Sequence, residues 1–385
     1  MSAPGGRALV VAAAAVAALG AGVAPAAAAG HGSFVGPLTS NVKVASTVPG
    51  NGDVNPYGVA VVPASRGKLV AGDVLVSNFN NAPTASAPGG EQGRGTTLVE
   101  ISPTGTRKLF ARIAPSTIPG GVGLTTALVV LRPGWVVVGS LPTTDGTSAT
   151  MRRGQLIVLD AAGTVRETIT GNGINGPWDA TALDNGTSAD LFVSNVLNGI
   201  VNGQPSATNK GTVVRLMLNL RGNMPRVVSS TVIANGLPVH TDPAALVVGP
   251  TGVALGSGGG LFVADTVGSR IARVPNAISR STAFNAGAAS ATVSASPHLN
   301  GPLGLILAPN GDLIAMNGGD NNLVELTRMG EVVAVRDLDT VDPPGGALFG
   351  LAATAAPRAV YYVNDDTNTL NVLKKPPRSP GQIDR

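Results

Sequence analysis

The sequence contains no cysteine, and this absence excludes several kinds of protein at once. Disulfide frameworks, iron–sulfur clusters, cysteine-based zinc sites and thiol nucleophiles all need that residue. The fold must therefore be stabilised by the burial of apolar side chains. A chain of 385 residues is long enough for this, because chains of such size bury about three quarters of the surface that they expose when unfolded.

Charged and aromatic residues are also scarce, at 12% and 3% of the chain. The 26 lysines and arginines barely exceed the 22 acidic residues, and they are scattered along the sequence. Nucleic-acid-binding proteins carry a dense basic stripe with interleaved aromatic residues, which this sequence lacks. We therefore expect no nucleic-acid partner.

Long apolar runs are missing except near the N-terminus. Arg7 precedes an Ala-rich apolar segment, and the small residues Ala27–Ala29 follow it as a cleavage site. We expect residues 1–29 to be a signal peptide, with an uncleaved membrane anchor as the alternative. Residues 30–40 would be a flexible start and residues 374–385 a Pro-rich polar tail. The mature protein would then be secreted, extracellular or periplasmic, with no membrane insertion after signal cleavage.

Glycine and proline are abundant, at 52 and 29 residues, and they bound short β-rich runs. One pattern recurs six times over residues 41–373. It comprises an apolar strand that often opens with proline, a glycine turn, a second strand that ends in Asn or Asp, and two further strands. This pattern predicts an all-β fold, a six-bladed β-propeller with four-stranded blades. A β-sandwich or a seven-bladed propeller is the alternative.

The fifth repeat shows the pattern most clearly, with its first two strands at Gly301–Leu307 and Asp312–Asn317. In the fourth repeat, we assign the first strand to Asp242–Leu246 and the second to Leu261–Asp265. Its fourth strand is unclear from the sequence.

The sixth repeat lacks a fourth strand at its own end. The run Asn41–Val48, which precedes the first repeat, is rich in β-branched residues and belongs to no repeat. A ring of sheets leaves an open edge unless its ends are joined. We predict that this N-terminal strand pairs with Thr369–Leu373 and completes the last blade.

The run Pro302–Asn317 resembles an NHL repeat in its Pro, Gly, aliphatic strand, Pro-x-Gly turn and second strand ending in Asn. Leu261–Asp265 followed by Arg270–Val274 is a second close match. Over Asn41–Leu373, the chain resembles the NHL-repeat and gluconolactonase-like six-bladed propellers. The resemblance implies a secreted bacterial member of this group. These propellers include scaffolds, ligand binders, lactonases and lyases, so the function has to be argued from a site.

In a four-stranded meander, the ends of the second strands and the starts of the first strands meet on one face of the propeller. We expect the ligand to bind on this face, where Trp178 would offer a stacking surface and Asp179 a charge. The candidate ligand-binding residues are Tyr57, Asn78, Trp178, Asp179, Asn195, Asp265, Asn317 and Asn364.

The Asn and Asp residues of this ring have two interpretations. They can satisfy backbone groups in Asx turns, which explains their repetition in every blade. They can also hold a divalent cation, since oxygen ligands around an axial channel suit Ca²⁺. Gluconolactonase-like propellers hold a catalytic cation with such a set, but it includes a Glu that has no counterpart near Tyr57. We expect no cofactor, with Ca²⁺ on Asn195, Asp265 and Asn317 as the alternative.

The sequence contains three histidines, so few combinations of ligands could form a zinc site. His31 lies in the expected flexible start, whereas His240 and His298 precede the expected first strands of the fourth and fifth repeats. Together with Asp242 these two would supply the minimum of three ligands. Solvated loop histidines are the simpler interpretation.

The loops between the second and third strands are long in the first three repeats, at residues 79–95, 141–153 and 196–210. Long loops on a rigid scaffold are where binding usually resides. We therefore expect a monomeric protein that binds an unknown small molecule, glycan or envelope protein on this face, and that is not an enzyme. The alternative is a metal-dependent lactonase- or lyase-like enzyme with a divalent cation in the axial channel.

Overall fold

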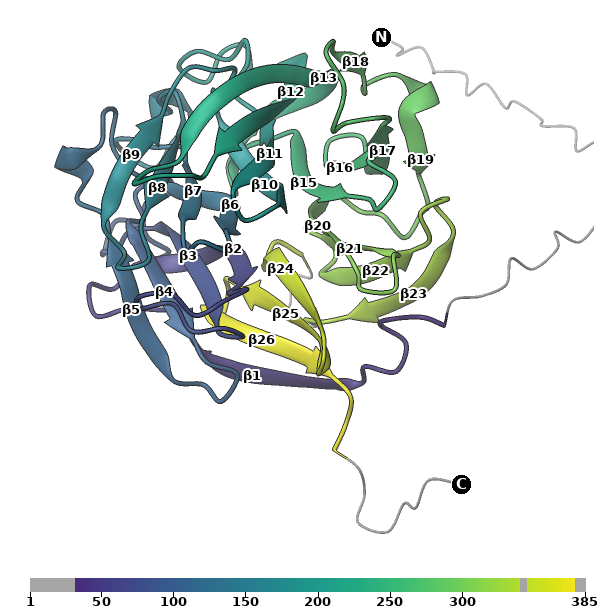
Figure 1. Ribbon diagram of the computed structural model, residues 1–385, viewed down its shortest axis with the longest axis horizontal. Coiled ribbons are helices and arrows are strands. Elements are labelled where there is room, and N and C mark those ends of the chain that lie inside the picture. The colour runs from purple at the N-terminus through teal and green to yellow at the C-terminus, as the bar shows by residue number, and fades with distance from the viewer. Residues whose placement is uncertain (1–31, 340–344, 378–385) are drawn as a thin grey trace, which may run out of the picture. The chain divides into compact units, whose positions relative to one another are not determined.

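A computed structural model of the chain describes residues 32–339 and 345–377. Within these residues, six β-sheets stand around a common axis as the blades of a β-propeller (Figure 1). The predicted six-bladed propeller is therefore confirmed. No helix in the described ranges has the length and apolar character that crossing a membrane requires. The expected signal peptide and residues 378–385 of the expected tail lie outside the described residues.

Each blade is a meander that runs from an innermost strand at the axis to an outermost strand at the rim. Blade 3 is larger, because the short strands β14 and β18 pair with its outer strand β13. From axis to rim, the strands are β2 (Val54–Val61), β3 (Val74–Asn80), β4 (Thr97–Ile101) and β5 (Arg107–Arg112) in blade 1; β6 (Leu124–Val130), β7 (Val136–Ser140), β8 (Gln155–Leu159) and β9 (Val165–Ile169) in blade 2; β10 (Pro177–Asp184), β11 (Ser188–Asn195), β12 (Ala207–Asn219) and β13 (Arg226–Asp242), with β14 (Leu246–Val248) and β18 (Phe284–Asn285), in blade 3; β15 (Pro250–Leu255), β16 (Leu261–Asp265), β17 (Arg270–Val274) and β19 (Thr292–Ser294) in blade 4; β20 (Pro302–Leu307), β21 (Leu313–Asn317), β22 (Asn322–Leu326) and β23 (Val332–Asp337) in blade 5; and β24 (Leu348–Ala355), β25 (Arg358–Asn364), β26 (Thr369–Lys374) and β1 (Ser40–Ser46) in blade 6.

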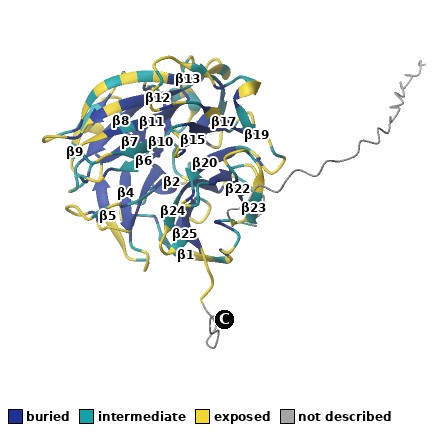
Figure 2. Ribbon diagram, turned by 45° about the vertical axis from the view of Figure 1, so that its right-hand side comes forward, coloured by how far each residue is buried: buried dark blue, intermediate teal, exposed yellow. Residues whose placement is uncertain are grey.

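Apolar side chains fill the spaces between successive blades. The middle strands β3 and β4 are buried at every position, because each of their faces contacts another blade or the core. This explains why the repeats read as short aliphatic runs rather than as alternating apolar and polar residues. The outer strand β5 is exposed at four of its six positions, and Figure 2 shows the same change from buried centre to exposed rim.

The N-terminal strand closes the ring as predicted. Strand β1 pairs antiparallel with β26, from the pair Ser40 and Lys374 to the pair Ser46 and Thr369. It is the outermost strand of blade 6, whose other three strands come from the C-terminal end of the chain. The ends of the chain are thus joined within one sheet, and no open blade edge remains between blades 6 and 1.

The flexible start expected at residues 30–40 is wrong for residues 33–38, which we call the N-terminal latch. The buried Glu325 carboxylate accepts hydrogen bonds from the backbone amides of Phe34, at 2.6 Å, and Val35, at 2.9 Å. Both of these side chains are buried against blades 5 and 6. The sequence pattern missed the latch because its anchor lies almost 300 residues away.

The innermost strand of blade 4 is β15, which starts at Pro250, and not the expected segment Asp242–Leu246. That segment joins β13 to β14, in a hairpin at the end of a long outer strand of blade 3. Pro250-Thr-Gly252 repeats the Pro-x-Gly motif of β2 and β20, and the extra hairpin before it led to the wrong assignment. His240 therefore lies on an outer strand and not at the start of an inner one.

Candidate functional site

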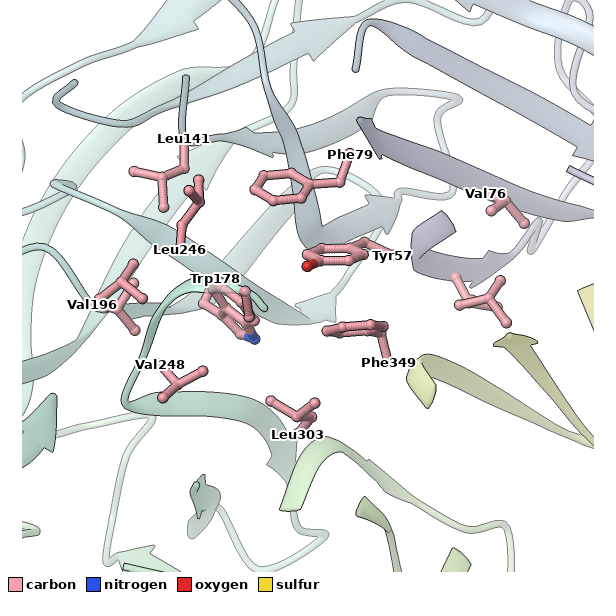
Figure 3. Close-up of a cluster of buried hydrophobic side chains, with 14 of the residues drawn as sticks. Tyr57, Val76, Phe79, Leu141, Trp178, Val196, Leu246, Val248, Leu303 and Phe349 are labelled. Carbon is pink, nitrogen blue, oxygen red and sulfur yellow. The ribbon is translucent and has the colours of Figure 1, made fainter. Parts of the chain in front are cut away.

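One end of the propeller axis is closed by packed aromatic side chains, which we call the axial plug. Tyr57 is at its centre (Figure 3), with its ring stacked on Phe79 at a centroid distance of 4.4 Å and on Phe349 at 4.1 Å. The ring of Trp178 lies 5.9 Å away at a tilt of 53°. Leu246 packs in the same cluster from the hairpin between β13 and β14.

The axial plug lies on the face where we expected the ligand. Tyr57 and Trp178 are 0% and 1% exposed, so neither ring offers a surface for stacking with a ligand from solvent. Phe79, near the end of β3 on this face, belongs to the cluster together with Leu141 and Val196 from the long loops of blades 2 and 3. These loops therefore help to close this end of the axis.

Two polar atoms are buried inside the axial plug. Within the part of the chain that the structure describes, neither the Tyr57 hydroxyl nor the Trp178 Nε1 has a hydrogen-bond partner. Burial, with a further contribution from the charge of Asp365, raises the pKa of Tyr57 well above its usual value. The hydroxyl is therefore neutral at physiological pH.

The predicted Asn and Asp ring is present but lies under the protein surface. Its five members at the ends of second strands are at most 5% exposed: Asn78, Asn195, Asp265, Asn317 and Asn364. Their hydrogen bonds are divided between the turns that follow the strands and segments farther away in the sequence. The Asn364 Oδ1 accepts from the Thr367 amide at 2.9 Å, whereas Asn78 donates to the Thr47 carbonyl, 31 residues away, at 3.2 Å. The first kind of contact is that of strand-end residues that organise turns.

The three residues considered for Ca²⁺ make similar contacts. The Asn195 Oδ1 accepts from the Asn175 amide at 3.0 Å, and Asp265 forms a buried ion pair with Arg270 at 2.8 Å. The Asn317 amide nitrogen donates to a carbonyl, while its Oδ1 has no partner. A cation on this set would have to replace the first two of these interactions.

The zinc alternative has no better support in the geometry. His298 is exposed in the loop before β20, and the His240 Nδ1 lies 2.8 Å from the Thr241 carbonyl. Across residues 32–339 and 345–377, no group of three or more His, Asp or Glu side chains is arranged to hold a metal ion.

The other end of the axis is a channel with a volume of about 310 Å³. Its walls are the innermost strands β2, β6, β10, β15, β20 and β24, each of which has one edge that pairs with no other strand. Leu303 and Phe349 belong to both the channel wall and the axial plug, so the plug forms the channel floor. Val61 and Leu307, the last residues of their strands, also line the channel, which therefore opens on the face opposite the long loops.

The channel is lined mainly by aliphatic side chains, and Asp179 is its one ionisable lining residue. Asp179 follows Trp178 directly in β10, and successive side chains of a strand point in opposite directions. The strand therefore places Trp178 in the axial plug and Asp179 in the channel. These neighbours, which we expected to form one site, lie on opposite sides of the plug.

Asp179 takes a position that is glycine in four other blades. The Asp179 amide donates to the Ser194 hydroxyl at 3.0 Å, just as the Gly58 amide donates to Ser77 at 2.8 Å. The same position is glycine in blades 4, 5 and 6, at Gly252, Gly304 and Gly350. A repeat alignment on the Pro-x-Gly start would have revealed this exception.

The glycines allow neighbouring inner strands to approach closely. A Cβ atom at Gly252 would lie 2.3 Å from the Leu305 backbone nitrogen of blade 5, which leaves no room for a side chain. Between blades 3 and 4 the inner strands leave room for a side chain at this position. There the Asp179 Oδ2 accepts a hydrogen bond at 3.0 Å from the amide of Val253, the counterpart of Leu305.

Burial raises the pKa of Asp179 to about 7, although the amides of Val253 and Ala180 stabilise its ionised form. Water reaches part of this side chain, but only inside the channel, where protein surrounds it. The group can therefore take up or release a proton at neutral pH.

The long-loop face has a groove beside the axial plug, with a volume of about 440 Å³. Its lining includes Thr147 and Ser148 from blade 2, and Asn202 and Asp242 from blade 3. None of the eight predicted ligand-binding residues lines this groove. The groove is on the face where we expected a ligand, but it is formed by other residues than the predicted ones.

Comparisons with known proteins support the fold. No protein-family model and no curated protein matches this sequence. A gluconolactonase structure from Xanthomonas campestris aligns at 14% identity and a TM-score of 0.53, over 85% of this chain and 87% of that one. A luciferin-regenerating enzyme aligns at 11% identity and a TM-score of 0.51, over 89% and 96% of the two chains. The structure of a Penicillium chrysogenum α-L-arabinanase with arabinobiose aligns at 14% identity and a TM-score of 0.50, over 87% of this chain and 98% of that one. At these identities, the likeness shows a shared six-bladed propeller fold and nothing finer.

Proposed function

We propose that this protein binds a small molecule in the axial channel, and that Asp179 is the polar anchor for that molecule. The ligand enters from the face opposite the long loops, because the axial plug closes the other end. This differs from the binding face that we expected from the sequence.

The composition of the channel supports the proposal. Small-molecule sites are usually apolar concavities of about 300–1,000 Å³ with few polar groups that fix orientation. The channel has a comparable volume of about 310 Å³, aliphatic walls and one carboxyl group. The unpaired edges of the inner strands add backbone donors and acceptors at the axis.

One observation carries the proposal, which is the replacement of the repeated glycine by Asp179. Four blades keep a glycine at this position so that neighbouring inner strands can pack closely. Blade 3 instead places an acidic group in an apolar channel. Departures from an internally consistent pattern are expected at functional sites, where a local cost is accepted for activity.

Two matched substitutions test where the ligand binds. Leu307→Trp places a large side chain at the channel mouth, and Thr147→Trp does the same in the groove on the long-loop face. Ligand-observed NMR with a library of apolar and amphipathic small molecules should give signals that Leu307→Trp removes and Thr147→Trp keeps. The reverse pattern would move the site to the long-loop groove and contradict the proposal.

A second candidate function is acid–base catalysis in the same channel. A carboxyl group with a pKa near 7 is suited to transfer a proton at neutral pH, and burial gives Asp179 such a value. The similar structures include a gluconolactonase, so hydrolysis of glucono-lactone is a direct assay. In this scheme, the ionised Asp179 takes a proton from the water that attacks the lactone carbonyl. The ring C–O bond then breaks, and the departing alkoxide takes the proton from Asp179.

The lactone assay separates the candidates. Catalysis by Asp179 predicts that Asp179→Asn lowers turnover by about 100-fold or more. Turnover that survives Asp179→Asn but is lost on chelation would instead support the metal-dependent alternative, and elemental analysis of the purified protein would identify the metal. Binding without turnover supports the proposed ligand-binding function.

A further inference from the structure

Among the described residues, no side chain of opposite charge lines the channel beside the Asp179 carboxyl group. Six inner strands form the channel wall, and none of them contributes a lysine, arginine or histidine to it. The polar contacts of Asp179 are to backbone amides and not to a cation. An ionised carboxylate in an apolar enclosure is unfavourable unless an opposite charge is close to it.

We propose that the ligand of the channel carries a protonated amine attached to an apolar body, and that the ammonium group pairs with Asp179. This inference rests on the proposed function, since it needs the channel to be the binding site. The ammonium group supplies the missing counter-charge, and the apolar body contacts the aliphatic walls. A charge-assisted hydrogen bond then fixes the orientation of the ligand.

The lining favours an organic cation over a metal ion. Calcium takes about six to eight oxygen ligands. The channel side chains offer the Asp179 carboxylate and the hydroxyls of Thr126 and Thr181, and the Thr126 hydroxyl already donates to the Trp178 carbonyl. Most ligands of a calcium ion would therefore have to be backbone carbonyls or water. The remaining lining side chains are aliphatic, apart from Phe349, and such walls suit a hydrocarbon group.

Proton release gives the interaction a distinct signature. Burial raises the pKa of Asp179 to about 7, and the facing groups that oppose this are the amides of Val253 and Ala180. Below this pH the carboxyl group is neutral and forms no ion pair. Above it the group is ionised and pairs with the ammonium. Amine binding near pH 7 should therefore release a proton from Asp179.

The test compares two probes of nearly equal shape, phenethylamine and 2-phenylethanol, by isothermal titration calorimetry at pH 8. The amine should bind at least about tenfold more tightly than the alcohol, as a charge-assisted hydrogen bond would give. Asp179→Asn should bring this ratio close to one. Asp366→Asn, which removes an exposed acidic group at the other end of the propeller, should leave it unchanged.

The outcomes separate the amine inference from the proposed function. One outcome contradicts the amine inference and keeps the channel as the binding site: the wild-type protein binds both probes with equal affinity, and Leu307→Trp abolishes the binding of both. Amine binding that Leu307→Trp does not affect contradicts both. The assignment to Asp179 is also overturned if the amine binds more tightly than the alcohol to the Asp179→Asn variant but not to the Asp366→Asn variant.

A measurement on wild-type protein covers the case in which Asp179→Asn does not fold. Phenethylamine stays protonated between pH 6 and 8, so its affinity should rise over this range as Asp179 ionises, whereas that of 2-phenylethanol should not. The binding heat near pH 7 should vary with the ionisation enthalpy of the buffer, as proton release requires. A pH-independent amine affinity would contradict the inference.

Discussion

The Asp179 Oδ2 accepts a hydrogen bond from the Val253 amide at 3.0 Å, across the boundary between blades 3 and 4. The corresponding boundary between blades 4 and 5 has Gly252 against Leu305, with no space for a side chain. Asp179 therefore does two things at once. It links the inner strands of blades 3 and 4, and it places a titratable group in the axial channel.

The stability of the protein should fall as the pH rises from about 4 to about 7. Burial raises the pKa of both Asp179 and Asp365 from 3.8 to about 7. The folded state therefore holds these protons more tightly than the unfolded state does. The resulting contribution to the free energy of unfolding is complete below pH 3.8 and is lost as the pH rises through 7. Each group lowers the free energy of unfolding by at most about 1.4 kcal/mol per pH unit over this range.

The test is guanidinium unfolding at pH 5 and pH 7. Asp179→Asn should show a smaller fall in the free energy of unfolding between the two pH values than the wild type, because the amide does not titrate. Glu331→Gln, at an exposed position, serves as the control and should follow the wild type. An unchanged pH dependence in Asp179→Asn would show that its carboxyl group titrates at the same pH in both states.

Gly350→Ala should destabilise the propeller by about 1–3 kcal/mol or more, as overpacking in a core does. A Cβ atom at Gly350 would lie 2.0 Å from the Tyr57 carbonyl oxygen, where blade 6 meets blade 1. Gly258→Ala is the matched control, because nothing lies within 4 Å of its Cβ position. Calorimetric melting temperatures of the two variants should differ clearly, and equal values would mean that the inner strands can separate at no cost.

Glu325→Ala should lower the free energy of unfolding by about 3 kcal/mol, since it leaves buried amides of the N-terminal latch without acceptors. The exposed Glu331 gives the control substitution, Glu331→Ala. In the Glu325→Ala variant, limited proteolysis should cut the N-terminal latch, residues 33–38, before the propeller unfolds. Resistance of the latch in Glu325→Ala would indicate that apolar packing of Phe34 and Val35 is enough to hold it.

The mature protein should begin near Gly30 and be found outside the cytoplasm. This prediction comes from the sequence of residues 1–29 alone. N-terminal sequencing of protein from the native host, together with cell fractionation, would test it. Intact Met1 in the membrane fraction would support the alternative of an uncleaved anchor.

Much of the propeller could be predicted from the sequence, because each blade is a local unit. Four strands that follow one another pair in order, so the repeat of turns and aliphatic runs is enough to count the blades. The pairing of β1 with β26 was also predictable, since the first strand was the one piece left over. The error in blade 4 arose where a hairpin is inserted between Arg226 and Val248, because an insertion breaks the repeat on which the assignment depends.

The sequence by itself determined the fold class, the closure of the ring and the positions of the Asn and Asp residues at strand ends. Only the tertiary structure decided which end of the axis is open. Tyr57, Phe79 and Phe349 come from separate positions in the chain, and they meet only because the inner strands converge at the axis. That convergence closes the expected face and leaves Asp179 on the other side of the plug. A local pattern carries no information on which side chains meet at a point that all six blades share.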